Sequence, residues 1–254
     1  GQSQLPAYTG TPLHFDSTDK VKLIDTECSQ VYAQADIYRR TVITVAVNED
    51  VSYTLDLFRV RGGNRHTYSF HTQSYMAYTA EGLDLVPQVN EDGEYVGTYA
   101  GPDVPFGPDP NSTDTHFAAN PMYTRGYTWL KNVNRGKTLG DAGIFQVDFA
   151  QTNFQTEMQV DATGLHMKYH ALNDWKADSV DIVTGYPPRR KENASVPGFD
   201  YMFIQRTGEN LDTLFTGLLE PYKGESYILK AEPWPVAAEG RQDVVKAVKI
   251  TFKN

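Results

Sequence analysis

The stretch from residue 38 to residue 71 constrains the fold more than any other part of the chain, because it is predicted to form three consecutive β-strands. Residues 41–47 are almost wholly β-branched or small, and residues 51–60 make a second strand after a polar break of hairpin length. A Gly-Gly pair then offers a turn in which positive φ angles cost little, and residues 66–71 follow as the third strand. The pattern predicts a three-stranded antiparallel meander, the folding core of a large sheet.

Strand signals recur at short spacing along the rest of the chain, with turn residues between them and no convincing amphipathic helix. Residues 21–26 and 31–35 are predicted to pair, and residues 76–87 to hold one more strand. Later strands are expected at 129–133, 144–149, 157–161, 165–171, 179–184, 201–206, 214–219, 226–230 and 244–252. The sequence therefore predicts an all-β fold with little helix, a large antiparallel β-sandwich of the supersandwich type.

Two segments depart from this strand pattern. Residues 1–20 are polar, carry two prolines, and are expected to form an irregular N-terminal segment. Residues 88–126 are crowded with Gly, Pro, Asp and Asn but keep several aromatic side chains, which predicts a long ordered excursion packed over a sheet. Because no linker-like composition divides residues 21–254, these are predicted to form a single β-sandwich domain.

Charge and cysteine content narrow the functional classes. The net charge of −9 argues against a general nucleic-acid binder and against adhesion to anionic membranes, although a local basic cleft would still hold an acidic ligand. No apolar run approaches membrane-spanning length.

Cys28 is the only cysteine, which excludes an internal disulfide and a cysteine metal cluster. We expect its side chain to be partly buried and to pack as a small hydrophobic group.

The chain begins with Gly1 and carries neither an initiator Met nor a signal peptide. We interpret it as a processed protein or an excised piece of one. Signatures of a nucleophile elbow, a P-loop, a dinucleotide-binding turn and a zinc-protease helix are absent from the sequence.

Two pairs of histidines are candidates for metal or acid–base sites. His66 and His71 are five residues apart, so a regular strand directs them to opposite faces and they cannot share one metal. His166 and His170 share a face, but four residues of strand span about 13 Å, which is too far for joint ligation. We interpret the histidines chiefly as hydrogen-bonded residues of the sheets, with one of the first pair facing a groove together with Tyr68.

Five arginines are concentrated around the central stretch: Arg39, Arg40, Arg59, Arg61 and Arg65. Guanidinium groups recognise carboxylate and sulfate in bidentate fashion, so this cluster is suited to line a groove for an acidic polysaccharide. The alternative is cross-strand ion pairing, because several acidic residues lie in the same stretch. The sequence leaves both interpretations open.

Three tryptophans, Trp129, Trp175 and Trp234, are the candidates for sugar stacking if the chain is a free-standing carbohydrate-binding module. Core packing is the commoner fate of tryptophan, so the module is the alternative interpretation of this chain.

Three stretches resemble a known family. YRRTVITVAVNEDVSYTLDLFRVRGGNRHTYSFH (38–71) resembles a segment in the C-terminal β-sandwich of heparinase II/III-type polysaccharide lyases, where an Arg-rich strand, an Asp-Phe-Arg strand and a Gly-Gly-x-x-His turn occur in this order. GTYAGPDVPFG (97–107) resembles the loop that follows. GFDYMFIQRTGENLDTLFTGLLEPYKG (198–224) is similar to the family's Arg-x-Gly strand pair with its Phe-x-x-x-Leu-Glu-Pro-Tyr ending. Their order makes the resemblance fairly specific.

The resemblance implies a bacterial enzyme, periplasmic or secreted, that degrades uronate-containing acidic glycans such as glycosaminoglycans or alginate. Such enzymes carry an N-terminal α/α toroid before the β-sandwich and act by β-elimination. The uronate carboxylate is neutralised, a Tyr or His removes the C5 proton, and the 4-linked oxygen departs.

The family's catalytic Asn, Tyr and His lie in the toroid and in a His-x-His motif at the start of the sandwich, which also binds a structural metal. Nothing in this sequence matches that motif, so we expect no catalytic residue, no metal ligand and no cofactor in this chain, and a structural metal only in the parent enzyme. The resemblance thus implies an accessory sandwich that forms one wall of the substrate cleft.

The expected partners are an acidic polysaccharide and the toroid of the same protein, with no nucleic acid and no membrane. An apolar patch is expected where the toroid would pack. The residues expected at the substrate cleft are Arg39, Arg59, Arg65, His66, Tyr68 and His71.

Overall fold

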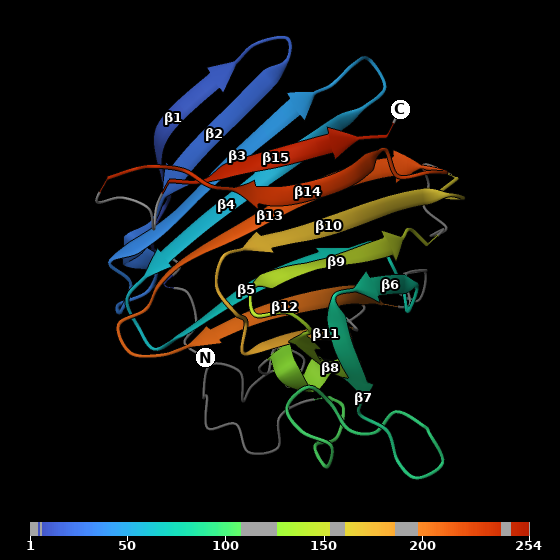
Figure 1. Ribbon diagram of the computed structural model, residues 1–254. Coiled ribbons are helices and arrows are strands. Elements are labelled where there is room, and N and C mark those ends of the chain that lie inside the picture. Colours follow the sequence, from blue (N-terminus) through green and yellow to red (C-terminus); the bar gives the residue numbers. More distant parts are fainter. Residues whose placement is uncertain are drawn as a thin grey trace.

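The computed structural model describes residue 5 and residues 7–107, 126–152, 161–185, 198–239 and 245–253. Within these ranges the chain forms two packed antiparallel sheets with a small third sheet against the larger one (Figure 1). The predicted all-β antiparallel sandwich is therefore confirmed. The described helices are the short 3₁₀ turns η1 (Ser29–Val31) and η3 (Gly126–Trp129), and none of them is long and apolar enough to cross a membrane.

The larger sheet, sheet A, has the strand order β1-β2-β3-β4-β13-β10-β9-β6 in the described residues. Its strands are β1 (Thr11–Ser17), β2 (Val21–Glu27), β3 (Ile37–Ala46), β4 (Ser52–Arg61), β13 (Asp212–Lys223), β10 (Leu165–Asn173), β9 (Gly143–Ala150) and β6 (Tyr78–Glu81). Sheet B has the order β5-β12-β11-β8-β7, formed by β5 (Arg65–Thr72), β12 (Phe199–Thr207), β11 (Ser179–Gly185), β8 (Leu130–Thr138) and β7 (Leu83–Pro87).

The core lies between sheets A and B, because the strands alternate apolar and polar side chains with a period of two. The inner faces supply the largest fully buried apolar side chains, among them Phe149, Tyr169, Phe215, Ile182, Met202 and Ile204. Gly217 on β13 makes room for the ring of Tyr169, since a Cβ there would lie 2.5 Å from its hydroxyl oxygen.

The outer faces of both sheets are also partly covered. The hairpin of β14 (Ile228–Trp234) and β15 (Ala247–Phe252) packs on the outer face of sheet A through a cluster that includes Leu172, Leu218, Ile228 and Ala231. On sheet B, Tyr99 packs with Leu130, Val133, Val183 and Phe203. Tyr99 belongs to residues 88–107, the described part of the predicted excursion, while residues 108–125 lie outside the described residues.

The predicted three-stranded meander is wrong in its third strand. β3 and β4 pair as expected, but the second partner of β4 is β13, and β5 pairs with β12 in the other sheet. The physical reason is burial: by crossing over, β5 places Tyr68 and Phe70 against the inner face of sheet A, where Phe58 and Phe215 contact the Tyr68 ring.

Three further expectations need correction. Residues 1–20 are not irregular throughout, because β1 pairs along β2 as an edge strand held by backbone hydrogen bonds, although all seven of its residues are exposed. Residues 31–35 end η1 and form a turn instead of a strand. Residues 76–87 form two strands in different sheets, separated at Gly82, whose φ is 78°.

The strand expected at 157–161 falls mostly on residues outside the described ones.

Candidate functional site

A groove opens between the two sheets where β4 ends and β5 begins. It consists of two hollows of about 590 Å³ and about 420 Å³ that share the lining residues Tyr32, Tyr38, Phe58 and Thr67. The larger hollow is also lined by Gln34, Ala35, Val60, Gly62, Gly63, Asn64, Arg65, His66 and Tyr127, and the smaller one by Gly10, Thr26, Glu27, Cys28, Arg40, Tyr68 and Ser69. These volumes are typical of ligand pockets, and we treat this groove as the candidate functional site.

The Gly62–Gly63 turn shapes the mouth of the groove. Both residues have positive φ angles, 96° and 78°, which glycine adopts readily. A Cβ on Gly62 would lie 2.3 Å from the carbonyl oxygen of Gln34, so a side chain does not fit there. The turn carries the chain from sheet A to sheet B and brings β5 to the groove.

Arg40, Asp56 and Tyr68 form a connected polar group on the inner wall. Asp56 is 2 % exposed and accepts two hydrogen bonds from the Arg40 guanidinium, at 2.8 and 2.7 Å, and one from the Tyr68 hydroxyl at 2.7 Å. Burial, the neighbouring Tyr169 and the Asp56 carboxylate raise the pKa of Tyr68 far above its usual value. Tyr68 is therefore a neutral donor, while the half-exposed Arg40 presents positive charge to the smaller hollow.

His66 is buried behind the glycine turn and both of its ring nitrogens are engaged. Nε2 lies 2.7 Å from the Gly62 carbonyl oxygen and Nδ1 lies 2.9 Å from the Thr213 hydroxyl. Burial lowers the pKa of His66, which favours the neutral ring. Since a carbonyl only accepts, Nε2–H donates to Gly62 and Nδ1 accepts from Thr213. The ring supports the turn and has no nitrogen free to act on a ligand.

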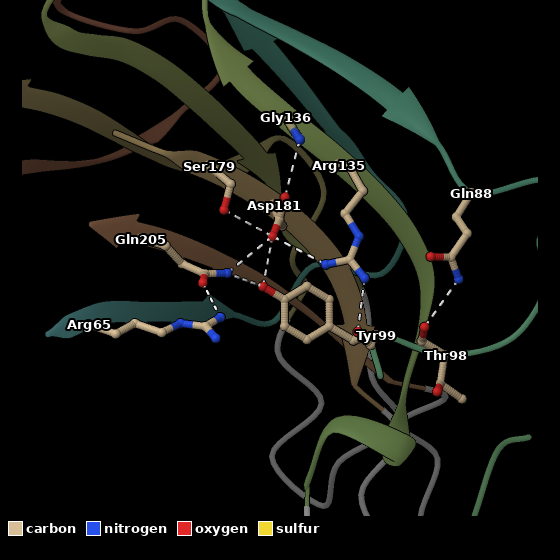
Figure 2. A network of polar contacts seen from close by, with 9 residues as sticks. All are labelled: Arg65, Gln88, Thr98, Tyr99, Arg135, Gly136, Ser179, Asp181 and Gln205. Atoms are coloured by element: carbon tan, nitrogen blue, oxygen red, sulfur yellow. Dashed lines mark hydrogen bonds and ion pairs between the residues drawn. The ribbon is translucent and has the colours of Figure 1, made fainter. Parts of the chain in front are cut away.

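Figure 2 shows a second polar network, centred on Asp181 of β11, on the outer face of sheet B. The buried Asp181 carboxylate accepts hydrogen bonds from the Tyr99 hydroxyl at 2.7 Å, the Gly136 N–H at 3.2 Å and Arg135 at 3.4 Å. Arg135 also lies over the Tyr99 ring, 4.3 Å from its centroid, and donates to the Tyr99 carbonyl. Burial together with Asp181 raises the pKa of Tyr99, which keeps its hydroxyl protonated.

This network reaches the groove at two points. Gln205 of β12 donates to Tyr99 and accepts from Arg65 (Figure 2). Arg65 is also a lining residue of the larger hollow. Tyr127, another lining residue, meets the Tyr99 ring edge to face at 5.1 Å. One side of the groove is thus held by the Asp181 network.

Arg39 and Arg59 lie elsewhere. They are cross-strand partners on the outer face of sheet A, opposite to Phe58 and the groove. Arg39 makes paired hydrogen bonds to Asp25, and Arg59 to Asp212. The pKa values of Asp25 and Asp212 lie below the usual value for aspartate, chiefly because each carboxylate accepts these arginine hydrogen bonds. Arg39 and Arg59 are therefore ion-paired and do not line the groove.

His71 points away from His66, as the strand parity predicts. It lies on the outer face of sheet B and stacks on Tyr201, with ring centroids 4.8 Å apart. Of the six residues expected at a cleft, the groove brings together Arg65, His66 and Tyr68, and it does not include Arg39, Arg59 or His71.

The second histidine pair lies on β10, which is a strand as predicted. His166 Nδ1 lies 3.0 Å from Asp148 and its ring stacks on Tyr222, while His170 Nε2 lies 2.8 Å from Glu220. Among the described residues, no group of three or more His, Cys, Asp or Glu is arranged to hold a metal ion.

The groove also includes residues that are not among the six expected at the substrate cleft. Arg40 belongs to the predicted arginine cluster, and strand parity places it on the same face as Phe58 and opposite to Arg39. Tyr32 and Tyr38 gave no signal of their own, because aromatic residues in strands are usually core residues. Cys28 is partly buried, as predicted, and lines the smaller hollow.

The three tryptophans have different surroundings. Trp175 packs against Phe215 and donates its indole N–H to the Leu214 carbonyl, and Trp129 meets Phe106 edge to face. Trp234, at the end of β14, is 50 % exposed. Of the three, Trp234 therefore presents its ring most openly to solvent.

Comparison with known proteins shows a fold likeness. The chain resembles the crystal structure of the heparan sulfate lyase HepC from Pedobacter heparinus, with a TM-score of 0.50 and 11 % sequence identity over 96 % of this chain. A mutant of the same lyase matches with a TM-score of 0.45 and 10 % identity. This chain spans 26 % of the length of the HepC chain. No protein-family model and no curated protein sequence matches it.

Proposed function

We propose that this chain is the β-sandwich part of a larger bacterial polysaccharide lyase of the heparinase II/III type. In this role it forms one wall of the substrate cleft and does not supply the catalytic groups. The observation that carries the proposal is the fold match, which takes in 96 % of this chain but about a quarter of the lyase chain. The ordered sequence motifs of that family support it.

The chemistry of the groove supports an acidic glycan as the ligand. Arg65 lines the larger hollow together with Tyr127, Arg40 lines the smaller one, and Tyr32 and Tyr38 line both. Guanidinium groups pair with uronate carboxylates and sulfates, and aromatic faces pack against sugar rings. A protein of net charge −9 would thus present a local basic surface to its substrate.

The reaction of the whole enzyme would be β-elimination. A base removes the C5 proton of the uronate, the C4–O bond breaks, and a C4=C5 double bond forms as the 4-linked sugar leaves. His66 has both ring nitrogens bonded and the Tyr68 hydroxyl donates to Asp56, so neither is suited to be the base. The base and the groups that neutralise the uronate would come from the rest of the protein.

An apolar surface supports a partner domain of the same protein, the α/α toroid. Phe15 and Ile24 are cross-strand partners on β1 and β2, and they are 69 % and 47 % exposed. Ile24 is aligned with Val42 and through it with the buried Asp56, so this surface continues the inner face of sheet A beyond sheet B. Exposed apolar side chains that adjoin in this way mark interaction sites. A periplasmic or secreted location belongs to the same proposal.

The proposal predicts that the chain by itself gives no rise in the ultraviolet absorbance of unsaturated uronate with heparin, heparan sulfate or alginate. The complete gene product, assayed in parallel, is expected to produce that rise with at least one of them. Turnover by the isolated sandwich, or a gene that encodes no helical domain beside it, would contradict the proposal.

A second prediction concerns Arg65 in the complete enzyme. Arg65→Ala is expected to raise KM for the acidic glycan about tenfold, because a charge-assisted hydrogen bond contributes about 1.5–3 kcal/mol. Arg61→Ala is the matched control, since Arg61 is an exposed arginine of the same region that pairs with Asp36 and does not line the groove. Equal KM values for the two variants would remove Arg65 from the cleft.

A further inference from the structure

A separate hollow of about 320 Å³ lies where the β14–β15 hairpin meets the outer face of sheet A. Its walls include Trp234 with Pro233 and Pro235 from the hairpin, Thr216 from β13, and Asp174, which follows β10. None of its lining residues lines the groove between the sheets. It is therefore an independent place for a ligand.

The Trp234 indole forms an open aromatic platform on one side of this hollow. Its side chain is 50 % exposed, although tryptophan is usually buried to a large extent. The Lys249 ammonium lies over one face of the ring, 4.6 Å from its centroid, and Lys249 itself does not line the hollow. An exposed ring with a cation nearby is suited to the apolar C–H face of a sugar that carries a negative charge.

Thr216 supplies a polar group without a partner. It is 1 % exposed, it lines the hollow, and its hydroxyl has no hydrogen-bond partner in the described chain. The adjacent Asn173 oxygen is already engaged, because it accepts from the Thr216 backbone N–H at 2.8 Å. Buried hydroxyls almost always have a partner, and a polar group bound in the hollow would supply one for Thr216.

Asp174 completes the set of polar groups. Its carboxylate side chain is 55 % exposed and pairs with Lys246, another lining residue. Carboxylate oxygens accept hydrogen bonds from sugar hydroxyls, and the lysine is placed to attract a carboxylate or sulfate. An aromatic platform beside a carboxylate, a hydroxyl and an ammonium group is a combination that binds saccharides.

We propose that this hollow is a saccharide subsite that holds one ring of an acidic glycan. The ring stacks on Trp234, its hydroxyls bond to Asp174 and Thr216, and its charged substituent lies near Lys246. The volume lies at the lower end for ligand pockets and suits one or two sugar rings. The subsite goes beyond the proposed lyase role and does not rest on it, because it would retain glycan chains away from the cleft.

The test is a titration of the chain with tetrasaccharides from heparin and alginate and with neutral cellotetraose, observed through the Trp234 indole N–H resonance. Trp234→Phe assigns that resonance. An acidic tetrasaccharide is expected to shift it, and Trp234→Ala is expected to weaken binding at least about tenfold. Leu229→Ala, at a 63 % exposed side chain of the same strand outside the hollow, is expected to bind like the parent chain.

Thr216→Val separates binding from folding. The valine methyl replaces an unpartnered hydroxyl, so the denaturation midpoint is expected to be unchanged or higher while affinity for the acidic tetrasaccharide falls about threefold or more. The subsite is refuted if no tetrasaccharide shifts the Trp234 resonance, or if Trp234→Ala binds as tightly as the parent chain. Tighter binding of cellotetraose overturns the assignment to acidic glycans. These outcomes concern binding alone, so they are distinct from failure of the lyase proposal, which is measured by turnover.

Discussion

Replacing Glu220 by glutamine is expected to lower the free energy of unfolding by about 3–5 kcal/mol, because it removes a buried charge from partners that remain buried. Glu220 is 0 % exposed on β13. One carboxylate oxygen accepts from the Ser226 hydroxyl at 2.8 Å and from the N–H groups of Tyr227 and Ile228 at 2.8 and 2.9 Å. The other lies 2.8 Å from His170 Nε2.

These contacts explain the size of the effect. A carboxylate accepts at both oxygens, whereas a glutamine amide accepts at one and places an NH2 group at the other, facing either His170 or the three donors from Ser226, Tyr227 and Ile228. Glu220 joins β13 to the segment that begins the β14–β15 hairpin, so the loss also loosens the hairpin that covers sheet A. For a domain of this size, each kcal/mol corresponds to about 2–4 °C in Tm.

The stabilisation that Glu220 gives to the fold is expected to be larger at neutral pH than at acidic pH. Burial by itself raises the pKa of Glu220, but the hydrogen bonds from His170, Ile228 and Ser226 outweigh it and leave the pKa below the ordinary value of 4.5. A carboxyl whose pKa is lower in the folded state stabilises the fold above the unfolded pKa, and this stabilisation is lost as the pH falls through the folded pKa. The difference between the parent chain and Glu220→Gln is therefore expected to be full at pH 7 and to shrink below about pH 4.5.

Urea denaturation followed by tryptophan fluorescence measures both effects. Glu225→Gln is the matched control, because Glu225 is an exposed glutamate of the same turn and is expected to change stability by less than about 0.5 kcal/mol. A Glu220→Gln variant that unfolds at the same urea concentration as Glu225→Gln would show that the buried carboxylate does not stabilise the fold.

Asp181→Asn is expected to cost about 3 kcal/mol and to release the segment around Tyr99 from sheet B. The Asp181 carboxylate gathers donors from Tyr99, Arg135 and the Gly136 backbone (Figure 2). Asparagine keeps the shape but offers one acceptor oxygen and loses the charge that faces Arg135. Because Gln205 links this network to Arg65, the groove wall is expected to loosen as well.

Hydrogen exchange detects this release directly. The Tyr99 N–H donates to the Leu130 carbonyl at 2.9 Å, so its protection reports whether the segment stays on sheet B. Exchange at Tyr99 is expected to accelerate in Asp181→Asn and to remain unchanged in Asp103→Asn, which alters an exposed aspartate of the same segment. Unchanged protection at Tyr99 in Asp181→Asn would mean that packing with Phe203 and Leu130, and not the carboxylate, holds the segment.

For the predicted arginine cluster, the sequence alone could not distinguish groove lining from ion pairing. The fold shows which of the two applies to each arginine. Arg39 and Arg59 pair with Asp25 and Asp212 on the outer face of sheet A, whereas Arg65 lines the groove. Asp212 is far from Arg59 along the chain, so no local pattern identifies it as the partner.

Most strand positions, and the faces of individual residues within those strands, were determined by the sequence itself. Alternation with a period of two is a local property, so it placed β4, β10 and β12 closely and separated His66 from His71 correctly. It missed β1, because an edge strand with every residue exposed carries no alternation.

Only the tertiary structure decided which sheet each strand joins. β5 looks like the third strand of a meander, yet it crosses to sheet B because Tyr68 and Phe70 are buried only against the opposite sheet. The backbone of a strand can form hydrogen bonds with any other extended segment. The choice of partner strand therefore depends on which side chains become buried across the sandwich, and not on the local sequence pattern. The groove exists for the same reason: it lies where the chain leaves one sheet for the other, at the Gly62–Gly63 turn.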